Sequence, residues 1–185
     1  MTAVRYVALL RGINVGRNKR IGMADLRAAL TEAGFGDVRT LLQSGNVVLT
    51  APVDAPVDAA AVAAGVERVV LERFGHDVRV IVRTADELAR VVAESPLPEP
   101  EDGSRFLVAF LSGAPDPGAF REPELPEGSR ERWWPRGAEV YVWCPDGLQN
   151  SPIMDHFGRH PLAVDVTVRN WNTVTKLAAL AGTAD

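Results

Sequence analysis

A loop near the N-terminus gathers positive charge and glycine without any acidic residue. In the stretch LLRGINVGRNKRIGM, residues 9–23, three glycines accompany four cationic side chains, those of Arg11, Arg17, Lys19 and Arg20. Guanidinium and ammonium groups donate hydrogen bonds to phosphate and carboxylate oxygens, and glycines allow backbone N–H groups to approach such a ligand closely. These residue types therefore predict an anion-binding loop.

The loop lacks the spacing of the established nucleotide-binding motifs. A P-loop has four residues between its glycines and then Gly-Lys-Ser/Thr, whereas three residues separate Gly12 from Gly16 here and Arg17 follows. A G-x-G-x-x-G pattern is absent as well. The sequence thus predicts anion recognition without nucleotide hydrolysis. The alternative is a structural loop, because glycines close turns and exposed cations keep loops hydrated.

A predicted hairpin supplies a second group of polar side chains. Ser44, Gly45 and Asn46 separate two apolar runs and tolerate the left-handed backbone of a tight turn. In a βαββαβ chain the first and second strands run parallel with the third between them, so the loop after the first strand and this hairpin emerge at one edge. We therefore expect Asn14 and the four loop cations to lie close to Gln43, Ser44 and Asn46.

A third polar stretch, RNWNTVTK at residues 169–176, combines cations with an aromatic side chain. A cation that flanks an exposed aromatic ring is typical of surfaces that stack a base. The alternative is that Trp171 belongs to the core and that an asparagine caps the last helix. The predicted ligand-binding residues of this stretch are Arg169, Asn170, Trp171, Asn172 and Lys176.

Other reactive residues do not form a recognisable catalytic or metal site. Cys144 continues the alternation of Val140 and Val142, which predicts a core strand position rather than a nucleophile. His156 and His160 have a metal-ligand spacing, but Phe157 stands where the zincin motif has glutamate, and the same stretch holds no further His or Cys as a third zinc ligand. We predict neither a metal nor a cofactor. Paired carboxylates and a catalytic triad are not recognisable, so whether the protein is an enzyme stays open.

The elements that position these residues follow from periodicity and from residues typical of helix ends. Asp58 is expected to cap a helix that Gly75 ends, and Thr84 with Glu87 forms a capping-box pattern for another helix. The first 83 residues predict the order βαββαβ, a ferredoxin-like arrangement within an α+β protein. The expected elements are a strand at 6–10, a helix at 23–35, strands within 38–50, a helix at 59–74 and a strand at 77–83.

A proline-rich acidic stretch divides the chain. The segment SPLPEPEDGS will not continue a helix or a central strand, so we predict a ferredoxin-like subdomain at 1–94, a linker at 95–104 and a second, smaller α+β subdomain at 105–185. The second part repeats the theme loosely, with a strand, an irregular stretch, a hairpin near Gly137 and a final helix. A degenerate duplication is one interpretation of this repetition.

Composition limits the classes of function. The 185 residues are 46% hydrophobic, enough for a real core, and 20 basic against 24 acidic residues give a net charge of -4. This balance argues against broad adhesion to nucleic acid or anionic lipid, so an anion site must be local. A single cysteine and the lack of a signal peptide or an apolar run of about 18 residues predict a soluble, cytoplasmic protein without a membrane partner.

Three stretches together resemble a known family. YVALLRGINVG, QSGNVV and RNWNTVTKL are similar to the uncharacterised family of domain of unknown function 1697 (DUF1697). The resemblance implies an α+β protein with a ferredoxin-like first part, and it implies no reaction. Ser151-Pro152 departs from the Ser-Lys pair that such proteins often present after a Pro-x-Gly turn. The motif positions that match are Arg11, Gly12, Asn14, Gly16, Gln43, Ser44, Gly45, Asn46, Arg169, Asn170, Trp171, Asn172 and Thr173.

The sequence therefore leaves three hypotheses about function. The first is binding of a phosphate-bearing ligand, either a phosphorylated small molecule such as a nucleotide or a nucleic acid. The second is a small enzyme acting on an anionic metabolite. The third is a structural or oligomerising protein whose motifs only tie loops together, and a homodimer is an open alternative.

Overall fold

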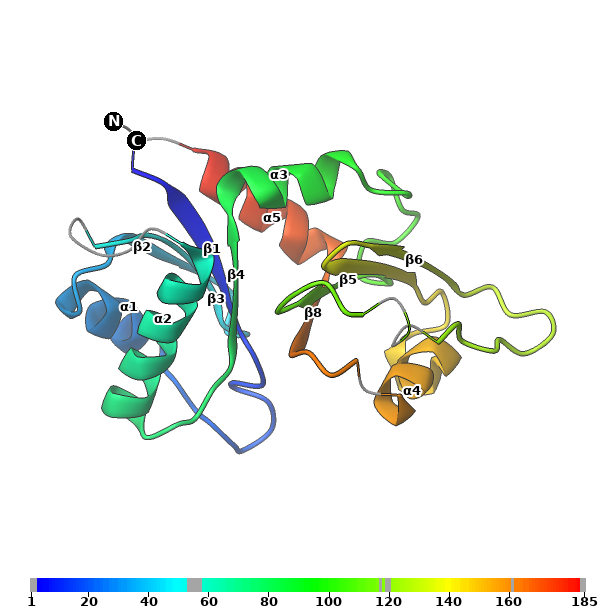
Figure 1. Ribbon diagram of the computed structural model, residues 1–185, viewed down its shortest axis with the longest axis horizontal. Coiled ribbons are helices and arrows are strands. Elements are labelled where there is room, and N and C mark those ends of the chain that lie inside the picture. Colours follow the sequence, from blue (N-terminus) through cyan, green and yellow to red (C-terminus); the bar gives the residue numbers. More distant parts are fainter. Residues whose placement is uncertain (1–2, 53–57, 117, 119–120, 161, 184–185) are drawn as a thin grey trace. The chain divides into compact units, whose positions relative to one another are not determined.

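The computed structural model describes residues 3–52, 58–116, 118, 121–160 and 162–183, and its ribbon is coloured along the chain in Figure 1. The chain forms two compact units. Unit 1 comprises Met1–Arg90 together with Lys176–Asp185, and unit 2 comprises Val91–Thr175. The proline-rich stretch at 95–104 lies within unit 2, and the C-terminal residues belong to unit 1.

Unit 1 is built on an antiparallel sheet with the strand order β2-β3-β1-β4. Since β3 pairs antiparallel with both β1 and β2, these two strands run parallel on either side of it. The predicted α+β class is confirmed. The elements are β1 (Arg5–Leu10), α1 (Met23–Glu32), β2 (Gly36–Leu41), β3 (Asn46–Thr50), α2 (Ala59–Phe74), β4 (Val80–Thr84) and the first part of α3 (Ala85–Ala93).

Helices α1 and α2 pack on one face of this sheet and bury a core with it (Figure 1). Tyr6, Ala8 and Leu10 point to that face and cluster with Leu26 of α1 and Val66 of α2, as the strand period of two and the helix period of 3.6 require. The alternate residues of β1 are also buried, so both faces of this strand are covered. A strand that is buried on both faces has a continuous apolar run in its sequence, as residues 6–10 do.

The helix ends agree with the predictions from sequence. Asp58 caps α2 by accepting a hydrogen bond from the Ala61 N–H, and Gly75 ends the helix with φ 68°. The Glu87 carboxylate accepts from the Thr84 N–H at 2.8 Å, while the Thr84 hydroxyl accepts from the Glu87 N–H at 3.1 Å. The reciprocal pair is the predicted capping box, and it fixes where β4 turns into α3.

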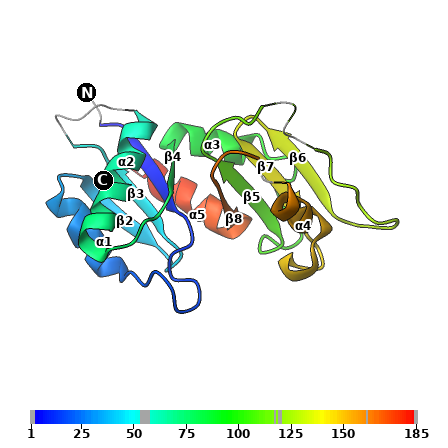
Figure 2. The same cartoon turned by 60° about the horizontal axis from the view of Figure 1, so that its bottom comes forward.

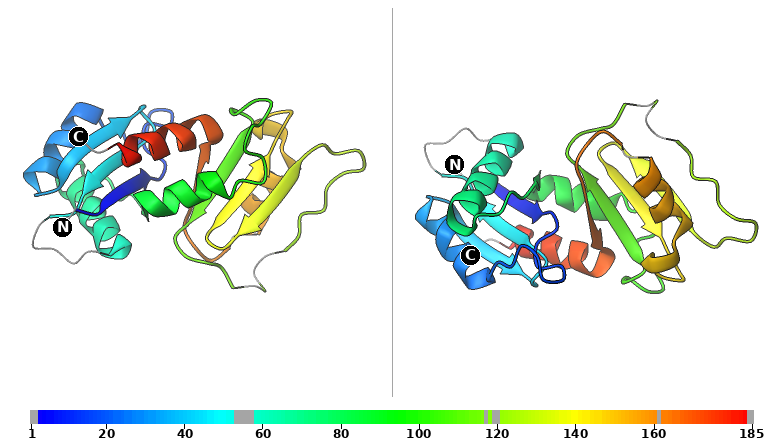
Figure 3. Two further views of the ribbon diagram at one scale, coloured as in Figure 1. Left: turned by 90° about the horizontal axis from the view of Figure 1, so that it is seen from above. Right: turned by 90° about the horizontal axis from the view of Figure 1, so that it is seen from below.

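Unit 2 contains a second antiparallel sheet, with the order β6-β7-β5-β8 (Figure 2). Helix α4 packs on one of its faces, where Ile153 lies among core residues of β5 and β7 (Figure 3, right). The elements are β5 (Phe106–Leu111), β6 (Arg132–Arg136), β7 (Glu139–Trp143), the 3-10 turn η2 (Leu148–Asn150), α4 (Pro152–Arg159), β8 (Val166–Asn170) and α5 (Trp171–Gly182), which continues from unit 2 into unit 1.

The two sheets repeat one topology. Strands β5 to β8 occupy the same places in their order as β1 to β4 in theirs, and a helix follows the last strand in both cases. The last strands also end alike, because the Nη1 of Arg83 and of Arg169 each donates to the preceding valine carbonyl at 2.9 Å. The repetition supports an internal duplication. Unit 2 differs at 112–131, where no α-helix is found in the described residues.

In the part of the chain that the structure describes, every helix is too short or too polar to cross a lipid bilayer.

Candidate functional site

The loop after β1 and the turn between β2 and β3 lie against each other at one edge of the unit 1 sheet. The Leu10 N–H donates to the Gly45 carbonyl at 2.8 Å, and the side-chain amide of Asn14 donates to the Gln43 carbonyl at 2.7 Å. Gly45 has φ 82°, and a Cβ there would lie within 2.8–2.9 Å of side-chain atoms of Leu10 and Ile13. The close approach of the two segments therefore depends on a glycine.

Asn14 closes the loop on itself. Its backbone N–H donates to the Lys19 carbonyl at 3.1 Å, and its side-chain amide exchanges hydrogen bonds with the backbone of Ile21, both at 2.9 Å. Asn14 has φ 55°, a left-handed conformation that asparagine tolerates better than most residues. The amide predicted to face a ligand is thus used to shape the loop, while Ile13 and Ile21 anchor it in the core.

The segment before β4 joins the same edge, because β4 pairs antiparallel with β1 and Val80 lies opposite Leu10. The Arg11 N–H donates to the Arg79 carbonyl at 2.9 Å, and the Lys19 ammonium donates to the Asp77 carbonyl. The sequence-based prediction missed Arg79. Antiparallel pairing of the first strand with the fourth is the signal that would have placed it beside Arg11.

We call the loop 11–22, the turn 42–45 and the segment 76–79 the rim. The rim is locally cationic in a chain whose net charge is -4. Its acidic residue is Asp77, and Glu67 of α2 lies 3.8 Å from Arg79. Such a concentration of charge creates a local positive potential that the overall balance conceals. The cationic side chains, all exposed, are Arg11, Arg17, Lys19, Arg20 and Arg79.

The turn contributes surface groups of a different kind. Asn46 is completely buried, and its amide donates to the Leu41 carbonyl and the Ser44 hydroxyl, both at 2.9 Å. This amide therefore supports the turn rather than facing solvent. Gln43 and Ser44, by contrast, are exposed. They remain at the surface beside the loop.

Two apolar side chains on the rim point into solvent. Val15 is 69% exposed and Leu42 is 56% exposed, the highest values among the large hydrophobic residues that the structure describes. Leu42 also has φ 59°, which is unusual for a bulky residue. The prediction from sequence named the aromatic Trp171 but no aliphatic residue, and it missed both.

The C-terminal motif has mainly structural contacts within unit 2. Arg169 is buried and donates to the Thr167 hydroxyl at 2.8 Å and the Val168 carbonyl at 2.9 Å. Desolvation lowers the pKa of its guanidinium to about 10, so it stays protonated at neutral pH. Trp171 is buried with its ring centroid 5.2 Å from that of Phe106, which makes it a core residue and not an exposed stacking surface.

The remaining motif residues mark the start of α5. Asn170 caps the helix by accepting a hydrogen bond from the Thr173 N–H at 3.0 Å. Asn172 is exposed, yet its side chain lies so close to Gly103 that a Cβ there would collide with it. Lys176 is exposed and belongs to unit 1, whereas the other four predicted residues of this motif belong to unit 2.

Cys144 is a core residue, as predicted. Its Sγ lies 3.4 Å from the Ser151 Oγ, which donates to the carboxylate of the buried Glu131 at 3.0 Å. The Ile153 N–H donates to the same carboxylate oxygen at 3.1 Å. Burial raises the pKa of the Cys144 thiol, which disfavours the reactive thiolate. The Glu131 carboxylate and the Ser151 hydroxyl thus stabilise the start of α4.

The two histidines of α4 also lie close together. The ring centroids of His156 and His160 are 4.6 Å apart, and the His156 Nε2 lies 2.8 Å from the Arg121 carbonyl oxygen. Within the described residues, no group of three or more His, Cys, Asp or Glu side chains is arranged to hold a metal ion.

Comparison with known proteins addresses the fold and the family. None of the curated proteins matches this sequence significantly. Among solved structures, the conserved bacterial protein SP0830 from Streptococcus pneumoniae is similar, with a TM-score of 0.78 at 20% sequence identity over 97% of this chain and 99% of that one. A likeness at this level of identity shows a shared fold.

The family model described as "Protein of unknown function (DUF1697)" matches residues 3–141. This range holds both the glycine-cation loop and the Ser-Gly-Asn turn, two of the three stretches that carried the resemblance in the sequence. The chain therefore belongs to the DUF1697 family of proteins of unknown function.

Proposed function

We propose that the rim of unit 1 binds a phosphate-bearing ligand, a nucleotide or a nucleic acid. The observation that carries the proposal is the hydrogen bond that joins the loop carrying the exposed Arg17 and Arg20 to the turn carrying the exposed Gln43 and Ser44. Guanidinium, amide and hydroxyl groups are the donors that phosphate oxygens accept from.

The loop offers these cations from a fixed backbone. Three hydrogen bonds join Asn14 to the backbone of Lys19 and Ile21, and a fourth joins it to Gln43. A loop that is already ordered loses less conformational entropy when it binds. Preorganisation of this kind favours recognition by a few exposed charges.

The start of α1 adds little to this site. The helix begins at Met23 with Gly22 as its N-cap, and no side chain caps it. Asp25 lies in the first turn, and its carboxylate approaches the position of a Cβ on Gly22 to 2.8 Å. Because this acid already offsets the positive end of the helix dipole, the loop cations are the principal attraction for an anion.

Tyr6 is not suited to acid-base chemistry at the rim. Burial raises its pKa above the usual value, with further contributions from the charges of Asp58 and Glu87. A phenol of this kind stays protonated near neutral pH and lies in the core. We therefore place binding ahead of catalysis.

Charge reversal tests the proposal. We expect the double variant Arg17→Glu, Arg20→Glu to bind a 5′-phosphorylated oligonucleotide at least about tenfold more weakly at low salt, because two surface ion pairs are replaced by repulsion. Isothermal titration calorimetry on the full-length chain measures the affinity.

A matched control carries the same kind of change elsewhere in unit 1. Arg68 is exposed on α2, so Arg68→Glu alters the net charge without touching the rim. Equal affinities for the double variant, the control and the unaltered protein would show that the rim is not the site.

A further inference from the structure

We infer that the ligand of the rim is single-stranded nucleic acid, whose phosphates contact the loop cations while its bases pack on Val15 and Leu42. This inference rests on the proposed function and adds the chemical class of the ligand. The observations that carry it are the exposure of these two apolar side chains, the backbone conformation of one of them, and their position on the rim.

The two side chains stand out from the other exposed apolar residues. Val15 and Leu42 are 69% and 56% exposed, whereas Val4, Leu71 and Leu148 are 45–52% exposed. Scattered exposed apolar residues are ordinary on protein surfaces. Here the two most exposed ones in the described residues fall on one small part of the molecule, which calls for a physical reason.

Leu42 occupies a strained conformation with its side chain in water. Its φ is 59°, in the left-handed region where glycine and asparagine are favoured and a bulky residue is disfavoured. Packing does not explain the leucine, since more than half of its side chain is exposed. Strain that burial does not offset is typical of a position that contacts a ligand.

One hydrogen bond joins the two segments that carry Val15 and Leu42. Val15 directly follows Asn14, and Leu42 directly precedes Gln43, while the Asn14 amide donates to the Gln43 carbonyl at 2.7 Å. Each apolar residue is therefore one peptide unit from the point where loop and turn meet. Arg17 and Arg20 are exposed within the same loop.

A ligand that suits this surface has both phosphate oxygens and an apolar face. Bases of a single strand expose their faces, whereas stacking hides them in a duplex. Small ligands are usually held in concave pockets that bury most of their surface, but residues 15–20 of the loop are all exposed. A flexible strand can follow a short exposed rim, and it can avoid the acids of a chain whose net charge is -4.

The experiment separates phosphate contacts from base contacts. Fluorescence anisotropy measures the binding of an oligothymidylate of about eight nucleotides, within the range of single-strand site sizes, and of an abasic oligomer of the same length. We expect the unaltered protein to bind the first about tenfold more tightly. The variant Leu42→Asn should lose this preference while it retains its affinity for the abasic oligomer.

Two controls keep the result interpretable. Leu71→Asn replaces an exposed leucine on α2 and should preserve the preference for bases. The thermal midpoint of Leu42→Asn should be unchanged or higher, because asparagine tolerates the left-handed conformation better than leucine. A variant that binds less well without being less stable has lost a contact and not its fold.

The outcomes distinguish this inference from the proposed function. Equal affinity for the thymidylate and the abasic oligomer overturns the base contacts and leaves phosphate binding standing. Thymidine monophosphate bound as tightly as the oligomer overturns the assignment to nucleic acid in favour of a free nucleotide. A plot of the logarithm of affinity against the logarithm of salt concentration should be less steep for Arg17→Gln. Its slope should change by about 0.7 for each phosphate contact that is lost. An unchanged slope and affinity overturn the proposed function itself.

Discussion

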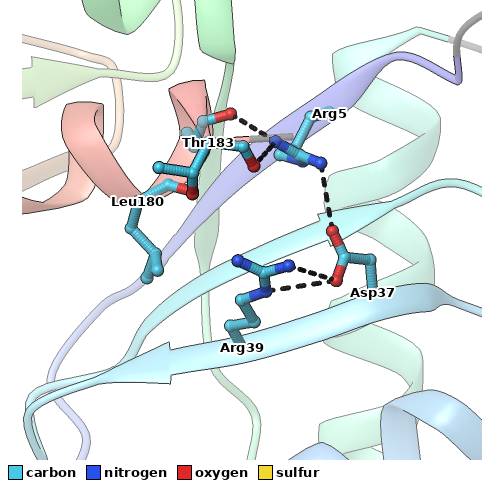
Figure 4. A network of polar contacts seen from close by, with 6 residues as sticks. Arg5, Asp37, Arg39, Leu180 and Thr183 are labelled. Atoms are coloured by element: carbon cyan, nitrogen blue, oxygen red, sulfur yellow. Dashed lines mark hydrogen bonds and ion pairs between the residues drawn. The ribbon is translucent and has the colours of Figure 1, made fainter. Parts of the chain in front are cut away.

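At the scale of single residues, Arg5 joins three parts of unit 1 (Figure 4). Its Nη1 donates to the carbonyls of Ala181 and Thr183 at the end of α5, and its Nη2 lies 3.2 Å from a carboxylate oxygen of Asp37. The other oxygen of Asp37 lies 3.0 Å from Arg39. The planar guanidinium spans β1, the β2 bulge and the last turn of α5, which a lysine ammonium cannot do.

We predict that Arg5→Lys lowers the free energy of unfolding by about 1–2 kcal/mol. The ammonium can keep one partner but not all of them, so carbonyl oxygens at the end of α5 lose a hydrogen-bond donor. Urea denaturation followed by circular dichroism measures the change. Arg68→Lys on α2 serves as the control and should stay within about 0.5 kcal/mol. Equal losses in both variants would contradict a special role for Arg5.

Tyr141 provides a prediction about pH. Its hydroxyl donates to the Val91 carbonyl at 2.6 Å, and burial, aided by the negative charge of Glu139, raises its pKa to about 12 from 10.0. The unfolded chain therefore releases this proton first, so the stabilising contribution is complete below pH 10 and is lost as the pH rises towards 12. The difference between the pKa values of this hydroxyl in the folded and unfolded chain corresponds to about 3 kcal/mol in the free energy of unfolding.

Urea denaturation at several alkaline pH values tests this dependence. Tyr141→Phe should remove this contribution, so its stability should fall less between pH 10 and 12 than that of the unaltered protein, while the lowered pKa of Arg169 acts in the opposite direction in both proteins. If the variant and the unaltered protein lose stability in parallel, Tyr141 is not the group responsible.

At the scale of elements, the loop after β1 is a closed structure on a fixed base. Asn14 ties its two ends together, Ile13 and Ile21 anchor it, and Gly45 leaves room for the turn to approach. The loop is thus positioned by the strand pairing of β1 with β3 and β4. Its tip, from Val15 to Arg20, is the exposed part.

We expect Asn14→Ala to open this loop. The variant loses several hydrogen bonds and places alanine at φ 55°, which together cost about 1–3 kcal/mol. Trypsin should then cleave the native protein faster after Arg17, Lys19 and Arg20. Asn18→Ala, an exposed change within the same loop, should leave the rate near that of the unaltered protein. Slow cleavage in both variants would show that Asn14 does not hold the loop.

At the scale of the whole molecule, unit 1 is discontinuous in sequence. Leu177 and Ala181 of α5 are buried, and the carbonyls that Arg5 contacts belong to the end of the chain. Residues separated by more than 170 positions thus complete one compact unit. The boundary expected at 95–104 rested on local composition, and composition carries no information about such distant contacts.

Truncation tests the discontinuity. A chain that ends at Lys176 lacks two buried apolar residues and the acceptors of Arg5, so its thermal midpoint should fall by several degrees or more. Ala179→Lys, an exposed change on the same helix, should have little effect. A truncated chain that melts at the same temperature as the full chain would exclude a structural role for the last turns of α5.

Local signals made much of the fold predictable from the sequence. Asp58, Gly75 and the Thr84–Glu87 pair mark helix ends through hydrogen bonds between residues three or four positions apart, which sequence patterns predict directly. The positions of Asn14 and Arg79 depend instead on hydrogen bonds to segments distant in sequence, with Gln43 and with Arg11. Val15 and Leu42 could not be predicted as site residues for another reason, because an apolar residue in a sequence is usually expected to be buried.

The repeated strand order allows the two halves of the chain to be compared position by position. After β1 the chain places four cations and no acid within the next ten residues, whereas the ten residues after β5, SGAPDPGAFR, hold one cation, Arg121, and one acid, Asp116. An antiparallel sheet of this order therefore assembles without a cluster of cations at the start of that connection. The arginines and the lysine of the first copy are not an architectural requirement, and the second copy serves as a built-in reference for what the topology alone demands.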